Sequence, residues 1–350
     1  MIQIAGRTIG RESEPFVIAE MSGNHNNSLE RALEIVDAAA KSGAHALKIQ
    51  TYSAETITIR SDRPEFRIED PDSLWSGRTL FELYDEASTP WDWHKEIFDR
   101  CTELGMLGFS TPFDSTAVTH LEALNVPCYK IASFEIIDLP LIRLVAQTGK
   151  PIIMSTGMAD VGEIHQAVET AKSNGCEGIV LLKCTSNYPA SPTDSNILTI
   201  PHLRDLFETE VGISDHTMGI GVSVAAVALG ATVIEKHFTL DRSEGGIDSN
   251  FSLEPDEFKR LVEESLRAHV SLGKIQYGLL ANEKTSKLHR RSLYVVEDVE
   301  EGAVASTRNV RSIRPGNGLE PALLDLIIGK KFTKSVKAGN PLSWDSFFEA

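Results

Sequence analysis

Residues 211–240 read VGISDHTMGIGVSVAAVALGATVIEKHFTL. A short apolar run, a helical run of small residues that ends at Gly230 and a second apolar run follow one another. This order predicts a strand, a helix and a strand. The strands end in the tripeptides SDH and EKH, so His216 and His237 occupy equivalent ends. Such ends are neighbours in a parallel sheet, and in a (β/α)8 barrel they face the mouth where active sites form.

These two histidines are candidate ligands of a divalent metal ion, because paired imidazoles suit such ions. The alternative is a pair of buried histidines that bond only to backbone groups, since two ligands alone do not specify a metal. The rest of the chain favours the first interpretation, because it repeats the pattern of polar residues at strand ends.

The remaining sequence alternates apolar runs with amphipathic helical runs. The apolar runs lack the alternation of half-exposed strands, as expected for parallel strands that are covered on both faces. Eight strand–helix units fit into about 270 residues, close to the usual length of a TIM barrel. We therefore predict an α/β fold, a (β/α)8 TIM barrel, with strands over residues 15–20, 46–52, 106–113, 128–133, 151–157, 178–189, 211–216 and 231–238.

Three segments lie outside this repeat. Residues 1–14 predict a small hairpin that plugs the bottom of the barrel. Residues 53–89 form a long polar insertion, and a loop of that length in a compact domain is usually functional. After Gly273 the chain predicts a polar connector and a small β-rich domain that is marginal by itself. We expect a barrel domain over residues 1–280, a linker over 281–290 and the small domain over 291–350.

Polar side chains gather at the carboxyl ends of the predicted strands. Lysines at buried strand ends are costly unless paired, so the set indicates function. Three lysines and several hydroxyl groups predict a basic pocket for a small anion with phosphate and carboxylate groups. With a metal that polarises an aldehyde, this indicates carbon–carbon bond formation with phosphoenolpyruvate. The set comprises Glu20, Lys48, Gln50, Thr111, Lys130, Ser133, Ser155, Lys183, Ser214, His216 and His237, with Glu135 as a further rim carboxylate.

The composition excludes several partners. A net charge of −16 over 350 residues argues against nucleic acid and against anionic membranes. No apolar run approaches membrane-spanning length, and the first residues do not show the pattern of a signal peptide. The four cysteines lack CxxC spacing, which indicates buried free thiols of a cytoplasmic protein.

Nearly the whole chain resembles the bacterial sialic acid synthases. The motifs that carry the resemblance are IAEMSGNHNNS, KIQTY, STPF, YKIASFE, STGM, LLKCTSNYP, GISDHT, VALGATVIEKHFTL and SLEPDEF, and RPGNG in the tail is similar to their antifreeze-like (SAF) domain. The resemblance implies a transferase that condenses phosphoenolpyruvate with an N-acetylated amino sugar and releases phosphate by C–O cleavage. It also implies a domain-swapped homodimer in which the SAF domain covers the partner's barrel mouth.

The resemblance further implies roles for single residues. His216 and His237 match ligands of Mn²⁺ or Mg²⁺, with Co²⁺ as a further candidate. Where the N-acetylneuraminate synthases have Asn before the aromatic motif, this chain has Ser186 and then Asn187. The resemblance therefore does not say which of the two makes the contact that the family assigns to that Asn. The expected catalytic residues are Glu20, Glu135, Lys130, His216 and Asp248. The expected phosphoenolpyruvate site is Lys48, Thr111, Lys130, Ser133, Ser155, Ser186 and Ser214, and the expected sugar site is Gln50, Tyr188, Asp248 and, across the dimer, Arg314.

The insertion bears on the acceptor sugar. Its segment SLWSGRTLFELYDEASTPWDWH, with KCTSNYP and RRSLY elsewhere, resembles the pseudaminic acid synthases more than the N-acetylneuraminate synthases. The expected acceptor is 2,4-diacetamido-2,4,6-trideoxy-L-altrose, and the alternatives are N-acetylmannosamine and the diacetamido-trideoxy-mannose that leads to legionaminate. Trp75, Tyr84 and Trp91 either contact this less polar sugar or anchor the loop in the core. An aldolase that uses free pyruvate, and a carbohydrate- or ice-binding module built on the tail, are alternatives from other classes.

Overall fold

The structure is a computed structural model that describes residues 1–71 and 73–348. These residues form two compact units, Met1–Gly273 and Lys274–Ala350. Each unit has its own hydrophobic core. The residues expected as a linker, 281–290, belong to the second unit and contain the short helix α11 (Lys284–Lys287).

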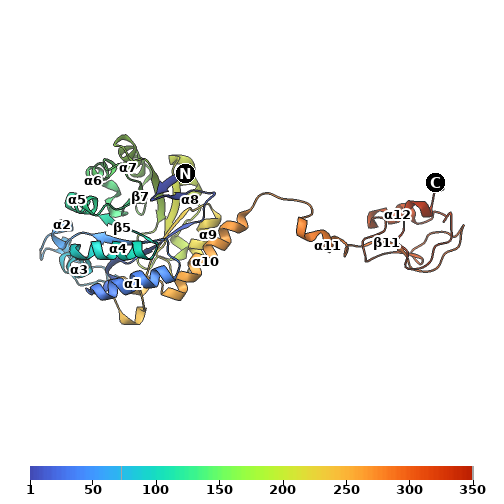
Figure 1. Cartoon of the computed structure of the whole chain (residues 1–350), viewed down its shortest axis with the longest axis horizontal. Coiled ribbons are helices and arrows are strands. Elements are labelled where there is room, and N and C mark those ends of the chain that lie inside the picture. The colour runs from blue at the N-terminus through green and yellow to red at the C-terminus, as the bar shows by residue number, and fades with distance from the viewer. Residues whose placement is uncertain (72, 349–350) are drawn as a thin grey trace. The chain divides into compact units, whose positions relative to one another are not determined.

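The first unit contains a closed barrel of eight parallel strands, as predicted (Figure 1). Each strand pairs with the next one along the chain, and β10 closes the ring on β3. The register places the carboxyl ends side by side, with His237 opposite Glu20 and Glu20 opposite Lys48. The strands are β3 (Phe16–Glu20), β4 (Ala46–Thr51), β5 (Leu107–Pro112), β6 (Tyr129–Ile131), β7 (Ile152–Ser155), β8 (Ile179–Cys184), β9 (Glu210–Ser214) and β10 (Val233–His237).

Helices between the strands surround the barrel, as Figure 1 shows. Their starts follow from local chemistry, since Ser28 caps α1, Asp138 caps α6, and Asp160 with Glu163 forms a capping box on α7. None of the helices in the described residues is long and apolar enough to cross a membrane. The helices are α1 (Leu29–Lys41), α4 (His94–Glu103), α5 (Ser115–Ala123), α6 (Leu139–Ala146), α7 (Val161–Ser173), α8 (Thr199–Phe207), α9 (Gly221–Ala228) and α10 (Pro255–Leu272).

The predicted amino-terminal hairpin consists of β1 (Ile2–Ile4) and β2 (Arg7–Ile9), which pair antiparallel. Its residues Ile4 and Ile9 are fully buried in the barrel core. The guanidinium of Arg7 lies over the ring of Phe16, the first residue of β3. The hairpin therefore covers the amino-terminal ends of the strands, away from the polar carboxyl ends.

The insertion at residues 53–89 is folded. It contains the short helices α2 (Ala54–Ile57) and α3 (Leu80–Ala87). Thr79 and Glu82 form a capping box at the start of α3, and Thr79 also forms an antiparallel bridge with Arg67. Local hydrogen bonds thus give this long connection a defined shape on the face of the barrel that carries the strand ends.

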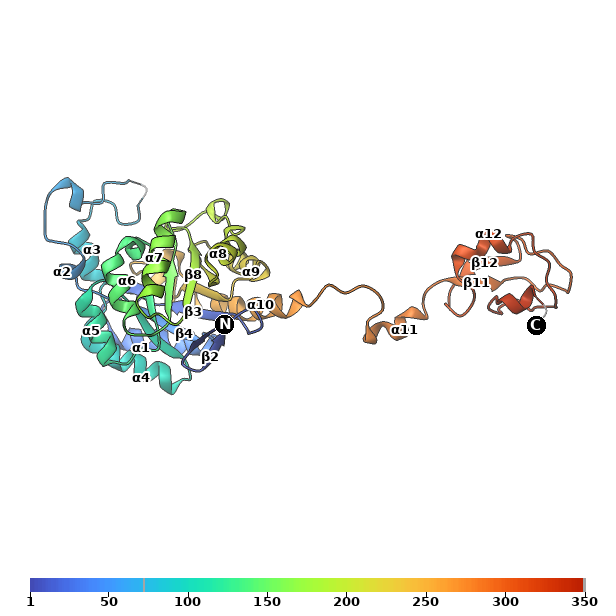
Figure 2. The ribbon, with the colours of Figure 1, turned by 90° about the horizontal axis from the view of Figure 1, so that it is seen from above.

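The second unit is the small β-rich domain expected from the tail, coloured orange to red in Figures 1 and 2. Strands β11 (Ser292–Val295) and β12 (Val310–Ile313) pair antiparallel, and one helical turn, α12 (Leu324–Ile327), follows them. Leu293, Val295 and Phe332 are among the residues of its small core.

Candidate active site

Side chains alternate between the two faces of β9 and β10, and this alternation builds the site. Ser214 and Glu235 meet inside the barrel, where Ser214 Oγ donates a hydrogen bond to Glu235 Oε1 over 3.2 Å. His216 and His237 lie two residues further along, and their ring centroids are 5.3 Å apart. The predicted meeting of the two histidines is therefore confirmed.

The centre of the site is a buried group of two lysines and two carboxylates, Glu20, Lys48, Lys130 and Glu235, here called the inner cluster. Lys48 Nζ lies 2.8 Å from Glu20 Oε2 and 3.6 Å from Glu235 Oε1. Lys130 Nζ lies 3.5 Å from the same oxygen of Glu235. Lys48 Nζ also donates to Thr111 Oγ1 over 3.2 Å. Because these side chains come from different strands, only the closed barrel brings them together.

Glu235 is the site residue that the sequence reasoning missed. Its Oε1 faces both lysines, which explains how two ammonium groups tolerate burial at one place. Its Oε2 has no hydrogen-bond partner among the described residues. A signal was present in the tripeptide EKH, because residues two apart on a strand share a face, so Glu235 had to lie on the side of His237.

Burial and neighbouring charges separate the two carboxylates of the inner cluster. Burial raises the pKa of Glu20, and the charge of Glu235 adds to this rise while Lys48 opposes it. Burial acts in the same sense on Glu235, but Lys130 and Lys48 outweigh it and lower the pKa of Glu235. Glu235 therefore remains ionised, and Glu20 is the carboxylate of this pair that takes up a proton first.

The loops after β6, β7 and β8 meet at a space lined by hydroxyl groups. Gly157 N donates to Ser133 Oγ over 3.1 Å. A Cβ atom on Gly157 would lie 2.3 Å from Ser186 Oγ and 2.8 Å from Ser133 Oγ, so a side chain there would fill the space. Ser155 Oγ, at the end of β7, is buried and has no hydrogen-bond partner within residues 1–71 and 73–348. Such spare hydrogen-bonding capacity suits the oxygen atoms of an anion. Gly157 was not among the predicted site residues.

Ser186 and Asn187 differ in position. Asn187 is exposed, and its Oδ1 accepts a hydrogen bond from the backbone N–H of Tyr188 over 3.2 Å. Ser186 Oγ instead lies beside Gly157 and 3.9 Å from Cys184 Sγ. Ser186 is thus the residue that faces the hydroxyl-lined space.

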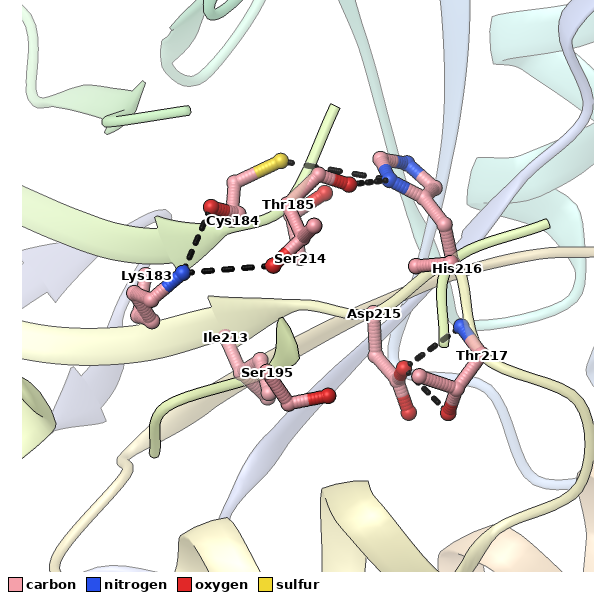
Figure 3. A pocket seen from close by; sticks show the side chains of 10 residues that line it. Lys183, Cys184, Thr185, Ser195, Ile213, Ser214, Asp215, His216 and Thr217 are labelled. Atoms are coloured by element: carbon pink, nitrogen blue, oxygen red, sulfur yellow. Dashed lines mark hydrogen bonds between the residues drawn. The ribbon is translucent and has the colours of Figure 1, made fainter. Parts of the chain in front are cut away.

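The two imidazole rings of the histidine pair differ in their hydrogen bonds. His216 Nδ1 lies 2.9 Å from the carbonyl oxygen of Thr185, which leaves Nε2 as its free nitrogen (Figure 3). Burial, followed by the charges of His216 and nearby lysines, puts the pKa of His237 well below its ordinary value, so this ring is neutral at pH 7. His237 Nδ1 has no hydrogen-bond partner in the described residues and lies 3.6 Å from Asp248 Oδ2. A neutral imidazole with an unpartnered nitrogen is the form that binds metals.

No group of three or more His, Cys, Asp or Glu side chains in the described part of the chain has the arrangement of a metal site. A metal at the histidine pair would therefore have two protein imidazoles and several positions for water or substrate. This donor set fits a catalytic ion rather than a structural one, because structural sites are closed by four protein ligands.

Cys184 is a free buried thiol, as predicted, but it lies inside the site. Its Sγ is 3.9 Å from His216 Nδ1. Burial would raise the pKa of Cys184, but His216 and, more weakly, Ser133 and Lys130 lower it to about 7. The position was not predicted to be functional, because an isolated cysteine in an apolar strand gives no signal of its own.

The residues expected at the sugar gather around the histidines and Glu20. Gln50 Nε2 donates to Glu20 Oε1 over 3.0 Å. The ring of Tyr188 lies 4.5 Å from that of His216 and 5.3 Å from that of Phe251, which is buried. These contacts bring Gln50, Tyr188 and Asp248 to the same end of the barrel as the inner cluster.

Glu135 lies in the loop after β6, as expected for a rim carboxylate. Burial raises its pKa to about 7, although the nearby charge of Lys130 acts in the opposite sense. Its Oε2 is buried and has no hydrogen-bond partner among the described residues. A carboxyl group that titrates near neutrality is suited to proton transfer.

One predicted pocket lysine points elsewhere. Lys183 Nζ donates to the carbonyl oxygen of Cys184 over 2.8 Å and to Thr185 Oγ1 over 3.3 Å (Figure 3). Cys184 occupies the inward position of β8, so the residue before it faces outward. The prediction of three pocket lysines was wrong, and Lys48 and Lys130 remain. Arg314 is exposed in the second unit, directly after β12, and its contact with a partner's barrel stays a prediction.

The three aromatic residues near the insertion have different positions. The ring of Trp75 lies 6.0 Å from that of Tyr188, which places Trp75 at the barrel mouth. Tyr84 makes an edge contact with Tyr52 at 5.9 Å. Trp91 Nε1 donates to the carbonyl oxygen of Tyr52, which follows β4, and so anchors the start of the insertion. Only Trp75 of the three reaches the residues around the histidine pair.

Comparisons with known proteins agree with this geometry. The model of the NeuB family matches residues 35–277, and the model of the SAF domain matches residues 290–347. Among solved structures, the N-acetylneuraminic acid (sialic acid) synthetase of Leptospira borgpetersenii serovar Hardjo-bovis, in complex with citrate, is 33% identical with a TM-score of 0.72. The match covers 81% of this chain and 94% of that one.

Two curated relatives differ in the product that they name. The chain is 43% identical to the pseudaminic acid synthase of Campylobacter jejuni subsp. jejuni serotype O:2, over 96% of this chain and 97% of the relative. It is 37% identical to the N,N'-diacetyllegionaminic acid synthase of Legionella pneumophila subsp. pneumophila, over 94% of each. The greater identity is with the synthase of pseudaminic acid.

Proposed function

The chain belongs to the NeuB family, and we propose that it condenses phosphoenolpyruvate with 2,4-diacetamido-2,4,6-trideoxy-L-altrose to give pseudaminic acid and phosphate. The observation that carries this proposal is the likeness to a pseudaminic acid synthase over nearly the whole length of both chains. The anion-binding character of the inner cluster and of the hydroxyl-lined space supports it.

The proposed reaction forms one carbon–carbon bond and breaks one carbon–oxygen bond. The electron pair of the enol double bond joins C3 of phosphoenolpyruvate to the aldehyde carbon of the open-chain sugar, and the aldehyde oxygen takes a proton. Positive charge develops at C2, where water adds and loses a proton. Phosphate then leaves with the electrons of its bond to C2 and takes up the proton of the new C2 hydroxyl group, and C2 becomes the new keto group or its ring form.

We assign phosphoenolpyruvate to Lys48, Lys130 and the hydroxyl-lined space. Lys48 and Lys130 both face Oε1 of Glu235, so two ammonium groups supply positive charge at one place. This charge favours an anionic substrate in a protein whose net charge is −16. Donors aimed at the phosphate also stabilise the charge that develops when the C2–O bond breaks.

Two carboxyl groups, Glu20 and Glu135, are suited to proton transfer because burial raises the pKa of each. Glu20 has a raised pKa and lies against Gln50, so we assign it as the acid that protonates the aldehyde oxygen. Glu135 titrates near pH 7 and has an unpartnered oxygen, so we assign it as the base that accepts the proton of the added water.

We also propose that His216 and His237 hold Mn²⁺, Mg²⁺ or Co²⁺. The neutral, unpartnered imidazole of His237 supports this assignment. When bound, such an ion supplies a Lewis acid for the aldehyde oxygen. Calorimetric titration of chelator-treated protein with Mn²⁺ should show one site per barrel in the wild type and none in His237→Ala. A wild type that binds no Mn²⁺ and keeps full activity in EDTA would rule out the metal.

The choice of acceptor is tested with phosphoenolpyruvate and three sugars. The altrose should give the highest kcat/KM, with one phosphate released per product, and N-acetylmannosamine and the diacetamido-trideoxy-mannose should react more slowly. Preference for either of the other sugars would transfer the assignment to N-acetylneuraminate or legionaminate synthesis. Turnover of free pyruvate without phosphate release would indicate an aldolase instead.

We propose that the active unit is a domain-swapped homodimer. The second unit has twelve Lys and Arg residues against nine Asp and Glu, which gives it a net charge of +3 and leaves −19 for the barrel unit. Opposite charges favour docking of the small unit on a barrel. Exposed apolar side chains on the segments that follow barrel strands supply further surface for such docking: Phe134, Ile137, Met158, Val161 and Met218.

Co-expression of two inactive variants tests the sharing of sites. Arg314→Ala and Lys130→Ala homodimers should each be nearly inactive. In a mixed dimer with shared sites, one site carries both changes and the other carries neither, so about half of the wild-type activity should return. Purified heterodimers without activity would show that Arg314 does not serve the partner's barrel.

We place the reaction in the cytoplasm, because the four cysteines are free thiols and free thiols are typical of reducing compartments. Cell fractionation should recover the synthase activity with the cytoplasmic contents. Activity found mainly outside the cytoplasmic membrane would contradict this placement.

A further inference from the structure

The insertion and the loops after β3 and β10 line an open cavity with a volume of about 480 Å³. Its two charged lining residues, Arg78 and Glu86, neutralise each other over 2.5 Å. The cavity therefore offers neutral hydrogen-bonding groups rather than net charge. Its other walls are an indole ring, aliphatic side chains and three amide groups, from Trp75, Leu74, Ile247, Asn26, Asn27 and Asn250.

Contacts of Trp75 place this cavity directly beside the active site. Trp75 Nε1 donates to the carbonyl oxygen of Ile247 over 3.1 Å, and Ile247 immediately precedes Asp248. The other side of Trp75 faces Tyr188, at 6.0 Å between ring centroids, and Tyr188 lies against His216. Two aromatic rings, Trp75 and Tyr188, thus lead from the cavity to the histidine pair.

The walls of the cavity are fixed by buried polar and close contacts. Asn24 is fully buried, and its side-chain amide makes three hydrogen bonds to residues between 238 and 252. Gly23 allows the insertion to approach, because a Cβ there would lie 3.2 Å from Ala87 Cα and 3.3 Å from Ile247 Cβ. A subsite with fixed walls can discriminate between ligands by shape.

We propose that this cavity is the subsite for the 4-acetamido and C6 methyl groups of the acceptor, and that Trp75 is the residue that selects them. The inference rests on the proposed function, in which the aldehyde of the open-chain sugar lies at the histidine pair. The carbon chain then extends away from that pair towards C4 and C6. An acetamido group needs neutral hydrogen-bonding partners and an apolar surface for its methyl group, which amides and an indole ring provide.

The same reasoning predicts that N-acetylmannosamine reacts more slowly. That sugar has a hydroxyl group at C4 and a hydroxymethyl group at C6. The diacetamido-trideoxy sugar has an acetamido group and a methyl group at these positions. It would leave the amide side chains without their partner and place a hydroxyl group against the indole ring. The loss of such matched polar contacts discriminates against the wrong sugar more strongly than the loss of a methyl group does.

The test uses two acceptors that differ only at C4, namely 2,4-diacetamido-2,4,6-trideoxy-L-altrose and 2-acetamido-2,6-dideoxy-L-altrose. In Trp75→Leu, kcat/KM for the diacetamido sugar should fall roughly 10–100-fold, mainly through KM, whereas the 4-hydroxyl sugar and the KM for phosphoenolpyruvate should change less than about threefold. Asn250→Ala should cause a selective loss of about tenfold. Trp91→Leu is the matched control, because Trp91 belongs to the same region but does not line the cavity.

The outcomes separate the subsite from the reaction. An equal loss for both acceptors in Trp75→Leu, or an equal selective loss in Trp91→Leu, overturns the subsite. A wild type that uses both acceptors equally well also overturns it, while the proposed reaction stands. A wild type that converts neither acceptor overturns the proposed function, and the subsite with it. If Trp75→Leu does not fold, Asn250→Ala decides, since Asn250 is exposed and its truncation leaves no cavity in the core.

Discussion

Two buried lysine–carboxylate groups lie on opposite faces of β10, which contributes Glu235 to one group and Lys236 to the other. The inner cluster faces the barrel interior. The other group, Asp215 and Lys236, faces outward towards α9 and is here called the outer pair; its nitrogen and oxygen atoms are 2.9 Å apart. Both groups are almost completely buried. They therefore differ in something other than burial or charge.

Every side-chain nitrogen and oxygen atom of the outer pair has a hydrogen-bond partner. Asp215 Oδ1 accepts from the backbone N–H and the hydroxyl group of Thr217, over 2.8 and 2.7 Å. Asp215 Oδ2 accepts from Ser223 Oγ over 2.6 Å and from Lys236 Nζ over 2.9 Å. Lys236 Nζ also donates to the carbonyl oxygen of Thr217. Neither Asp215 nor Lys236 is thus among the buried groups without a partner, and the pair ties the end of β9, β10 and α9 together.

The inner cluster and its surroundings are incompletely bonded. Glu235 Oε2, Ser155 Oγ and His237 Nδ1 are buried, and none of them has a hydrogen-bond partner in the described residues. Leaving such groups unpaired costs stability unless a ligand completes them. Unfilled bonding capacity, rather than buried charge, thus distinguishes the site from the wall of the barrel.

The largest effect is expected in the outer pair. Asp215→Ala leaves the ammonium group of Lys236 buried without its partner, so the free energy of unfolding should fall by about 3–5 kcal/mol. Urea denaturation measures this change. The double variant Asp215→Ala/Lys236→Met should recover part of the loss, because it removes the stranded charge. A single variant as stable as the wild type would contradict the structural role of the pair.

Changes in the inner cluster should lower activity rather than stability. Lys130→Met should lower kcat/KM for phosphoenolpyruvate by an amount equivalent to roughly 2–4 kcal/mol, with little change in the KM for the sugar. The free energy of unfolding should change by less than about 1 kcal/mol, because burial already disfavours the Lys130 charge and Lys48 still balances Glu235. A loss seen only in the KM for the sugar would contradict the assignment of Lys130 to phosphoenolpyruvate. A destabilisation as large as that of Asp215→Ala would show that the inner cluster stabilises the fold as the outer pair does.

The smallest effect concerns the pH profile. Because the pKa of Glu135 is raised to about 7 and only its ionised form accepts a proton, kcat/KM should rise as the pH increases through about 7. In Glu135→Gln this rise should disappear, and the remaining activity should be nearly independent of pH between about 6 and 8. Measurement of kcat/KM across this range, at saturating metal, checks the assignment. An unchanged inflection in the variant would assign it to another group.

Much of this architecture followed from local patterns. Apolar runs of strand length, helical runs between them and polar residues at their carboxyl ends predicted the barrel and its mouth before any contact was known. The candidates Lys48, Lys130, Ser133, His216 and His237 were found in this way, because strand ends in a parallel barrel converge. The same rule failed for Lys183, since closeness to a strand end does not say which face a side chain takes.

The sequence alone determined which residues stand at the strand ends and that they alternate in two sets, since alternation along a strand is a local property of the backbone. The tertiary structure decided which set faces inward, and so which lysine meets which carboxylate. Glu235 became the centre of the inner cluster only because β10 closes on β3 across more than two hundred residues of chain. Tertiary contacts likewise place Trp75 beside Tyr188 at the barrel mouth and Trp91 against Tyr52, although the two tryptophans are only sixteen positions apart along the chain. The face that a side chain takes and the partner that it meets depend on contacts between distant segments. No local sequence pattern contains this information.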